Sequence, residues 1–207
     1  MKKTEETKAR IIDVAVKLFN TLGYEKTSMD DIARFANKAK RSLYYHFASK
    51  EEIFQNAVEQ ELAEMQSRLE PLFENKSIQP AELFRDYFEQ RMEQLSQSKA
   101  YKIVLGYEMS ANHTLPYERF RTNLSSFENW EHDHFLEVCS RVGNVPDYDP
   151  AALTNMLQML IKSFDMMFFV QGKYKEYKTT FQLTVNQLTK GMALIINNNQ
   201  TTIDTKQ

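Results

Sequence analysis

The chain has 207 residues, of which 42% are hydrophobic, 26% charged and 12% aromatic, and one cysteine, so wholesale disorder, an intrachain disulfide and any multi-cysteine metal site are excluded. Residues 1–50 carry 11 Lys and Arg against 6 Asp and Glu, whereas the rest of the chain carries 15 against 22. This basic head on an acidic body suggests a polyanionic partner, although chance segregation of surface charge would give the same pattern. No signal peptide and no apolar run of about 20 residues is present, so we expect a cytoplasmic protein.

Scarce turn residues favour an all-α fold, because the chain holds only five Gly and five Pro. Residues 4–22 predict a first amphipathic helix, which Gly23 ends. Its apolar stripe is Ile11, Val14, Ala15, Leu18, Phe19 and Leu22.

Two short helices joined by a tight turn are expected next. Residues 27–36 begin with a capping-box pattern, and Asn37 suits the positive φ that such a turn needs. Lys40 to Phe47 form the second helix, so the pair predicts a helix-turn-helix. Ser49 to Glu52 then match a capping box that starts a long helix to about residue 70, where Pro71 marks a kink or an end.

The rest of the chain is expected to be helical with short interruptions. Pro80 and the Asp149-Pro150 pair are helix-start signals. One expected helix begins at residue 80. The others cover about 99–111, 117–141, 150–170 and 178–196. The chain therefore divides into an N-terminal three-helix domain, 1–48, and a helical body, 49–207.

The helix that starts near Ala39 presents polar and basic side chains opposite Leu43 and Phe47. Such a helix fits the major groove, and its side chains are of the types that contact phosphates, although the same face could simply be solvated. Together with the preceding capped helix and turn, it indicates binding to double-stranded DNA.

These residues carry a family resemblance. The pattern from Gly23 to Ala36, followed by Ser42-Leu43-Tyr44-Tyr45-His46-Phe47 and Lys50-Glu51, resembles the N-terminal signature of the TetR family of bacterial transcriptional regulators over residues 8–54. The resemblance implies a homodimer whose first three helices bind operator DNA. The other helices would bind a small-molecule effector and dimerise, and most members are repressors that the effector releases from DNA.

The resemblance also implies roles for single residues. Phosphate contacts are expected from Thr27, Ser28, Tyr44, Tyr45, His46 and Lys50. Base readout is expected from the start of the recognition helix, at Lys38, Lys40, Arg41 and Ser42. This chain has Asn37-Lys38 where the family usually has Gly-Val, and Arg41 where it often has Gly, so we expect Lys38 to extend outward and the operator sequence to be the chain's own.

Two seams with 4-3-4-3 spacing favour a dimer built as a four-helix bundle, although both stripes could instead face their own core. The seams are Leu153, Leu157, Leu160, Phe164 and Met167, and Phe181, Val185, Leu188, Met192 and Ile195.

Aromatic and methionine side chains in the middle helices could line an apolar ligand pocket or fill the core. The candidates are Phe84, Tyr87, Phe88, Met92, Tyr107, Met109, Phe120, Phe127, Trp130 and Met159.

An enzyme is the main rival class, but no nucleophile motif, phosphate-binding loop or cofactor motif is present, so we expect neither catalytic residues nor a cofactor. Glu128, His132 and Cys139 lie too far apart along one helix to chelate one metal ion unaided. A helical protein-interaction module, or a small-molecule or metal-binding protein without a role on DNA, remains the alternative.

Overall fold

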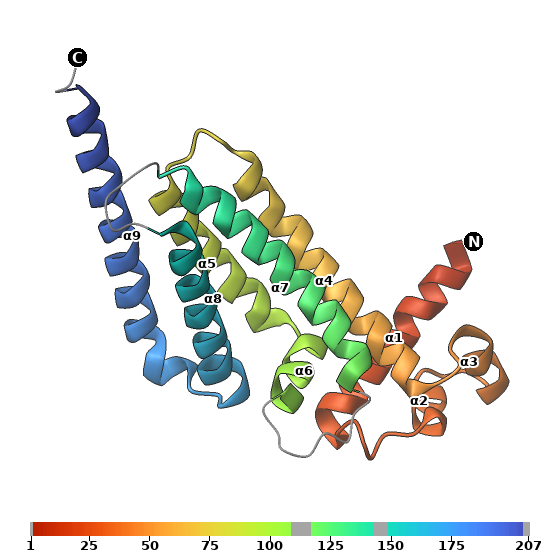
Figure 1. Ribbon diagram of the computed structural model, residues 1–207. Helices are drawn as coiled ribbons and strands as arrows, with labels where there is room; N and C mark the ends of the chain where they lie inside the picture. The colour runs from red at the N-terminus through yellow and green to blue at the C-terminus, as the bar shows by residue number, and fades with distance from the viewer. Residues whose placement is uncertain (1, 109–116, 143–148, 205–207) are drawn as a thin grey trace. The chain divides into compact units, whose positions relative to one another are not determined.

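The computed structural model describes residues 2–108, 117–142 and 149–204, and the side chains of 4–106, 121–142 and 149–194. The described residues form nine α-helices and one π-helical turn, without a strand, which confirms the all-α prediction (Figure 1). In chain order these are α1 (Lys2–Leu22), α2 (Met29–Phe35), α3 (Lys40–His46), α4 (Lys50–Glu74), α5 (Pro80–Gln97), α6 (Ala100–Glu108), α7 (Tyr117–Ser140), α8 (Pro150–Asp165), η1 (Met166–Val170) and α9 (Tyr174–Asp204). None of these helices combines the length and apolarity that crossing a membrane requires.

The chain divides into two compact units. Unit 1 is Met1–Glu64 with Gln97–Leu124, and unit 2 is Met65–Ser96 with Ser125–Gln207. Helix α4 therefore begins in unit 1 and ends in unit 2. A functional boundary at residue 48 stays a prediction, since the compact unit also includes the first half of α4.

Helices α1, α2 and α3 and the start of α4 form the head of unit 1, and an aromatic cluster lies at its centre. The rings of Phe19, Tyr24 and Phe54 lie 5.0–5.4 Å apart between centroids and come from α1, the α1–α2 loop and α4. All three are at most 3% exposed, and the predicted α1 positions Ile11 and Ala15 are fully buried. Burying three aromatic rings fixes the start of α4 against α1, on the scale of 1.5–3 kcal/mol for each buried large side chain, roughly.

The local signals for the helix-turn-helix are confirmed. Ser28 Oγ accepts from the Asp31 N–H at 3.1 Å, and the Asp31 carboxylate accepts from the Ser28 N–H at 3.1 Å. Asn37 has φ +53°, and the Lys38 N–H donates to the Ala33 carbonyl at 3.0 Å, which completes a Schellman turn after α2. These bonds set the angle between α2 and α3.

A carboxylate of α4 caps α6 within unit 1. Glu61 accepts hydrogen bonds from the backbone N–H groups of Lys99, Ala100 and Tyr101 at 2.9–3.2 Å, and from the Ser98 hydroxyl. A negative charge at the positive end of a helix dipole is stabilising, and here it satisfies three donors that have no partner inside the helix. This contact joins the middle of α4 to α6.

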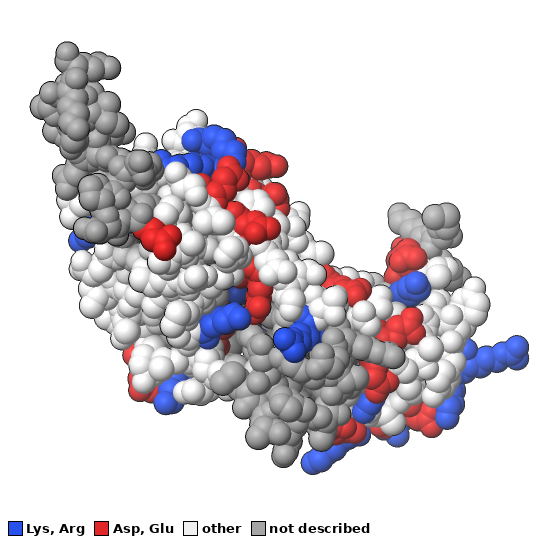
Figure 2. Space-filling view, viewed as in Figure 1, with Lys and Arg blue, Asp and Glu red and all other residues white. Residues whose placement is uncertain are grey.

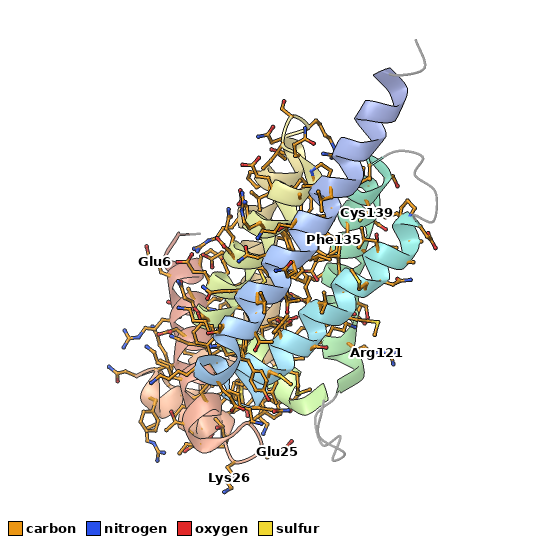
Figure 3. All side chains as sticks on the ribbon, turned by 90° about the vertical axis from the view of Figure 1, so that its left-hand side faces the viewer. Glu6, Glu25, Lys26, Arg121, Phe135 and Cys139 are labelled. Carbon is orange, nitrogen blue, oxygen red and sulfur yellow. The ribbon has the colours of Figure 1, made fainter. Side chains whose placement is uncertain are left out.

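Unit 2 is a bundle of α5, α7, α8, η1, α9 and the end of α4. Its core includes Phe84, Tyr87, Phe135 and Leu157, each fully buried. Phe135 and Cys139, labelled in Figure 3, are fully buried on α7.

Several helix boundaries differ from the sequence prediction. Helix α1 begins two residues before the expected Thr4, α4 continues through Pro71 to Glu74, and α9 covers Tyr174–Asp204 rather than about 178–196. The turn after α8 is a π-helix ended by Gly172 at φ +67°. Phe73 explains why α4 continues past Pro71, because its buried ring packs on Tyr87 and Trp130 and this packing outweighs the lost backbone bond.

A fully buried ionic cluster lies inside unit 2. Arg91 of α5 donates to Glu131 of α7 and to Asp165 of α8, each at 2.7 Å, and the Tyr87 hydroxyl donates to Glu131. All four residues are at most 3% exposed. Burial raises the pKa of both carboxyl groups, against the opposing effect of the guanidinium between them.

The stabilising contribution of this cluster should therefore decrease as the pH rises. The folded pKa values of the two carboxyl groups lie above the ordinary 4.5 of Glu and 3.8 of Asp, so between the ordinary and the raised values these two groups bind more protons in the folded chain than in the unfolded chain. We expect the free energy of unfolding to fall as the pH passes upward through the raised values, and Glu131→Gln to flatten that fall. Urea unfolding followed by Trp130 fluorescence measures it. Glu82→Gln, on the exposed side of α5, should keep the parental pH profile, and an E131Q profile identical to it would contradict the assignment.

Candidate nucleic-acid interface and ligand cavity

Helix α3 has one buried and one exposed face. Leu43 is fully buried and Phe47, directly after the helix, is 2% exposed. On the other face Tyr45 is 82% exposed and Tyr44 is 47% exposed. Lys40 and Arg41 are exposed as well, while Ser42 and His46 are half-buried. The exposed face thus carries two cations and two phenols, which suits contacts with phosphates and base edges.

Asp30 and Asp31 form ion pairs with cations on or near this surface. Lys40 forms an exposed ion pair with Asp30 at 2.8 Å, which raises the pKa of the ammonium. Hydrogen bonds from Ser28 lower the pKa of the Asp31 carboxyl, which also pairs with Arg34 at 2.6 Å. The Asp30 pair is solvent-exposed and worth little, so Lys40 can exchange it for a base or phosphate contact.

Two residues expected to contact phosphates, Thr27 and Lys50, donate hydrogen bonds to backbone carbonyls within the head. Thr27 is 2% exposed, and its hydroxyl donates to the Gly23 carbonyl at 2.8 Å. The Lys50 ammonium donates to the carbonyls of Tyr24, Glu25 and Thr27 at 3.0–3.3 Å, and lies 4.5 Å from the centroid of the Tyr24 ring. Lys50 therefore fastens the α1–α2 loop to the start of α4. A phosphate contact from either residue stays a prediction.

The loop, α3 and the start of α4 together surround one hollow of about 500 Å³, which collects half of the residues predicted to contact DNA. These are Thr27, Ser28, Lys40, Tyr44 and Lys50. Lys38 is half-buried, and Arg41, Tyr45 and His46 lie outside the lining. Lys26 and Glu25 occupy the outer end of the loop, where Figure 3 shows them pointing away from the chain.

Unit 2 holds a second cavity, of about 900 Å³, between α5, η1 and α9. Its floor is apolar and mostly buried, and consists of Met92, Phe168, Phe169, Phe181 and Val185. Its rim is polar and includes Glu89 and Glu93 of α5 and Tyr174 and Lys178 of α9. A concave apolar site with a few polar groups is typical of small-molecule binding.

Of the pocket residues expected from the sequence, Met92 lines this cavity. Phe84, Tyr87, Phe88 and Phe127 are core residues at most 3% exposed, Trp130 is half-buried, and Met159 is 70% exposed. The side chains of Tyr107 and Phe120 and all of Met109 lie outside the described residues. The sequence signal that was missed is the uninterrupted apolar run Met166 to Val170, which forms η1.

The seams predicted for the dimer pack largely within the chain. Five of their residues are at most 7% exposed: Leu157, Phe164, Phe181, Val185 and Met192. Leu153, Leu160, Met167 and Leu188 are half-buried, and the Ile195 side chain is not described. The Phe164 and Phe181 rings meet edge to face at 5.0 Å, so this pair joins α8 to α9 inside one chain.

A different apolar surface is exposed on α8 and α9. Met156, Met159, Leu183 and Leu194 are 39%, 70%, 57% and 63% exposed. Figure 2 shows a broad area with few charged side chains over the described part of these helices. Such a surface usually marks a contact with another molecule.

The residues weighed as metal ligands do not gather. Glu128 pairs with Lys162 at 3.0 Å, the His132 ring lies 3.5 Å from Asp133, and Cys139 is buried. Within the described ranges, no group of three possible ligands is close enough to hold an ion.

The capped α2, the Schellman turn and the amphipathic α3 define a helix-turn-helix protein. Residues 11–57 match the family model of bacterial regulatory proteins, tetR family. The chain is 50% identical over 52 residues to the biofilm operon icaADBC negative transcriptional regulator IcaR of Staphylococcus epidermidis, which covers 25% of this chain and 28% of that protein. The chain is therefore similar to the tetR family over its N-terminal residues 11–57.

Two solved structures extend the likeness beyond the head. The transcriptional regulator FadR of Bacillus subtilis, in complex with stearoyl-CoA, is 18% identical with a TM-score of 0.67, over 89% of this chain and 96% of that chain. AibR, in complex with isovaleryl coenzyme A and operator DNA, is 20% identical with a TM-score of 0.60, over 77% and 85%. At these identities the likeness shows a shared fold, and the sequence match to IcaR spans little more than a quarter of that relative.

Loss of the Lys50 ammonium should loosen the α1–α2 loop. Lys50→Ala leaves three carbonyls without their donor and removes the expected phosphate contact. We therefore expect about 1–3 kcal/mol less stability and weaker DNA binding with a log–log salt slope flatter by about 0.9. Lys26→Ala, in the same loop and exposed, should leave the melting temperature unchanged. Thermal unfolding and DNA titration at several salt concentrations measure both. An unchanged salt slope for K50A would show that Lys50 holds the loop without contacting phosphate.

Proposed function

We propose that this protein is a cytoplasmic, homodimeric, DNA-binding transcriptional regulator, most simply a repressor that a small molecule releases from its operator. The observation that carries the proposal is the exposed face of α3, which the Ser28–Asp31 capping box of α2 and a Schellman turn place in the geometry of a helix-turn-helix. We propose no catalytic role for the protein, and the matched relatives are regulators rather than enzymes.

Pairing of two chains follows from the readout. Two recognition helices must reach half-sites about 34–36 Å apart, one turn of the duplex. The exposed apolar side chains of α8 and α9 offer the surface for a second copy, because they remain uncovered after the seams have packed within the chain. Met159 is the most exposed of them, at 70%.

The effector site is the cavity between α5, η1 and α9. Its volume of about 900 Å³ is that of a small-molecule site, and its floor is buried and aromatic. FadR and AibR, which share the fold, were solved with acyl-CoA ligands, and this supports an organic effector for the present chain.

The effector acts by shifting a conformational population. It needs only a higher affinity for the conformation that does not bind DNA, and operator DNA must then weaken effector binding by the same factor. A typical coupling of about 1–3 kcal/mol corresponds to a 5- to 150-fold loss of operator affinity.

DNA recognition can be tested without knowledge of the operator. Selection from a random duplex library by the full chain should enrich a site with two related half-sites. Lys40→Ala or Arg41→Ala should alter the enriched bases, because a bidentate base contact is worth about 1–3 kcal/mol. Lys17→Ala, on the exposed side of α1, should enrich the parental site. If neither variant changes the bases, readout lies elsewhere, and a chain that enriches nothing would favour a protein-interaction module.

The dimer surface can be tested by one charge. Met159→Glu would bury a carboxylate in the interface, whereas in the single chain this side chain is 70% exposed, so folding should be unaffected. We expect sedimentation to show a monomer with unchanged helical content and lost operator affinity. Leu22→Glu replaces a similarly exposed apolar residue of α1 and should remain dimeric. An M159E chain that also stays dimeric places the interface on another surface.

A further inference from the structure

The cavity of unit 2 has an aromatic floor that suits the apolar part of a ligand. Phe168 and Phe181 meet at 5.6 Å between ring centroids, and Met92 lies beside them, all at most 7% exposed. The floor residues carry no charge, so the charged residues of the rim decide which sign of charge a ligand can carry.

The rim on α5 is negative and uncompensated. Glu89 and Glu93 are one helical turn apart and exposed, and both line the cavity. Within the described part of the chain, neither carboxylate forms an ion pair. Like charges at this spacing repel each other and destabilise a helix, so the helix itself gains nothing from this pair.

The rim on α9 already accommodates an ammonium group. Lys178 is the one cation among the lining residues, and it pairs with neither glutamate. Its nitrogen lies 5.8 Å from the centroid of the Tyr174 ring, within the range of a cation–π contact. The Tyr174 ring, which lines the cavity, therefore already lies against a positive charge, and a ligand cation would share or take over this contact from Lys178.

We propose that this cavity binds a hydrophobic organic cation, with its apolar body on the Phe168–Phe181 floor and its charge between Glu89, Glu93 and the Tyr174 ring. The proposal refines the effector site proposed above and rests on it for its regulatory meaning. The same rim repels an anionic head group, so the phosphates of an acyl-CoA are poorly matched to this mouth. The two carboxylates outnumber the single ammonium, which sets the preference.

Two probes of nearly the same shape and opposite charge test the sign directly. Tetraphenylphosphonium and tetraphenylborate should be titrated into the full chain by calorimetry. We expect the cation to bind about tenfold more tightly than the anion, which corresponds to 1.4 kcal/mol. Preference for tetraphenylborate, or binding of neither probe, would overturn the proposal.

Charge-changing variants separate recognition from simple hydrophobic binding. Glu89→Gln with Glu93→Gln should weaken tetraphenylphosphonium binding about 5- to 10-fold and strengthen tetraphenylborate binding, whereas Lys178→Gln should do the opposite. Glu82→Gln, on α5 outside the cavity, is the matched control and should change neither affinity. A rim variant that behaves like this control contradicts the assignment.

The outcome is distinguishable from that of the regulator proposal. A chain that enriches an operator but shows no charge preference overturns the cation site and leaves DNA binding intact. A chain that binds the cation through Glu89 and Glu93 without binding DNA supports the site and overturns the regulator.

Discussion

One continuous helix, α4, supplies bonding or packing partners to α1, the loop before α2, α6 and α7. In unit 1 its first residue, Lys50, fastens the loop before α2, Phe54 completes the aromatic centre of the head, and Glu61 caps α6. In unit 2, Glu70 accepts from the Trp130 indole at 3.0 Å and Phe73 packs in the core. Within each unit, these contacts tie α4 to its neighbours through backbone bonds, aromatic packing and a carboxylate cap.

Carboxylates in three different environments set the electrostatics of the fold. Glu61 faces the positive end of a helix dipole, where it compensates backbone donors. Glu131 and Asp165 share one buried guanidinium, so two negative charges meet one positive charge where desolvation is costly. Glu89 and Glu93 are exposed to solvent and lack an ion pair in the described structure. This excess of negative charge at the mouth of an apolar cavity selects among ligands and does not stabilise the helix.

The sequence predicted the features that short-range chemistry decides. The capping box at Ser28, the left-handed Asn37 and the Asp149 cap of α8 each depend on bonds within a few residues, and all three are confirmed. Features decided by packing were missed. Pro71 stays inside a helix because of tertiary contacts, and the cavity depends on how η1, α5 and α9 meet, which no periodicity encodes. For the same reason, the seam at Phe164 matches a coiled-coil spacing although its ring is buried within its own chain.

The length of α4 determines how an effector could control DNA binding. With 25 residues the helix is about 37 Å long, so a tilt of about 5° at one end moves the other by about 3 Å. Recognition helices that must match a separation of one duplex turn tolerate little displacement of this kind. The hydrogen bonds of Glu61 to α6 lie near the middle of α4 and resist such a tilt, while Lys50 transmits it to the loop before α2. Effector control therefore requires that the difference in ligand binding free energy between the two conformations exceeds the cost of shifting the contacts at Glu61. It also requires that the hydrogen bonds of Lys50 hold the loop before α2 in place.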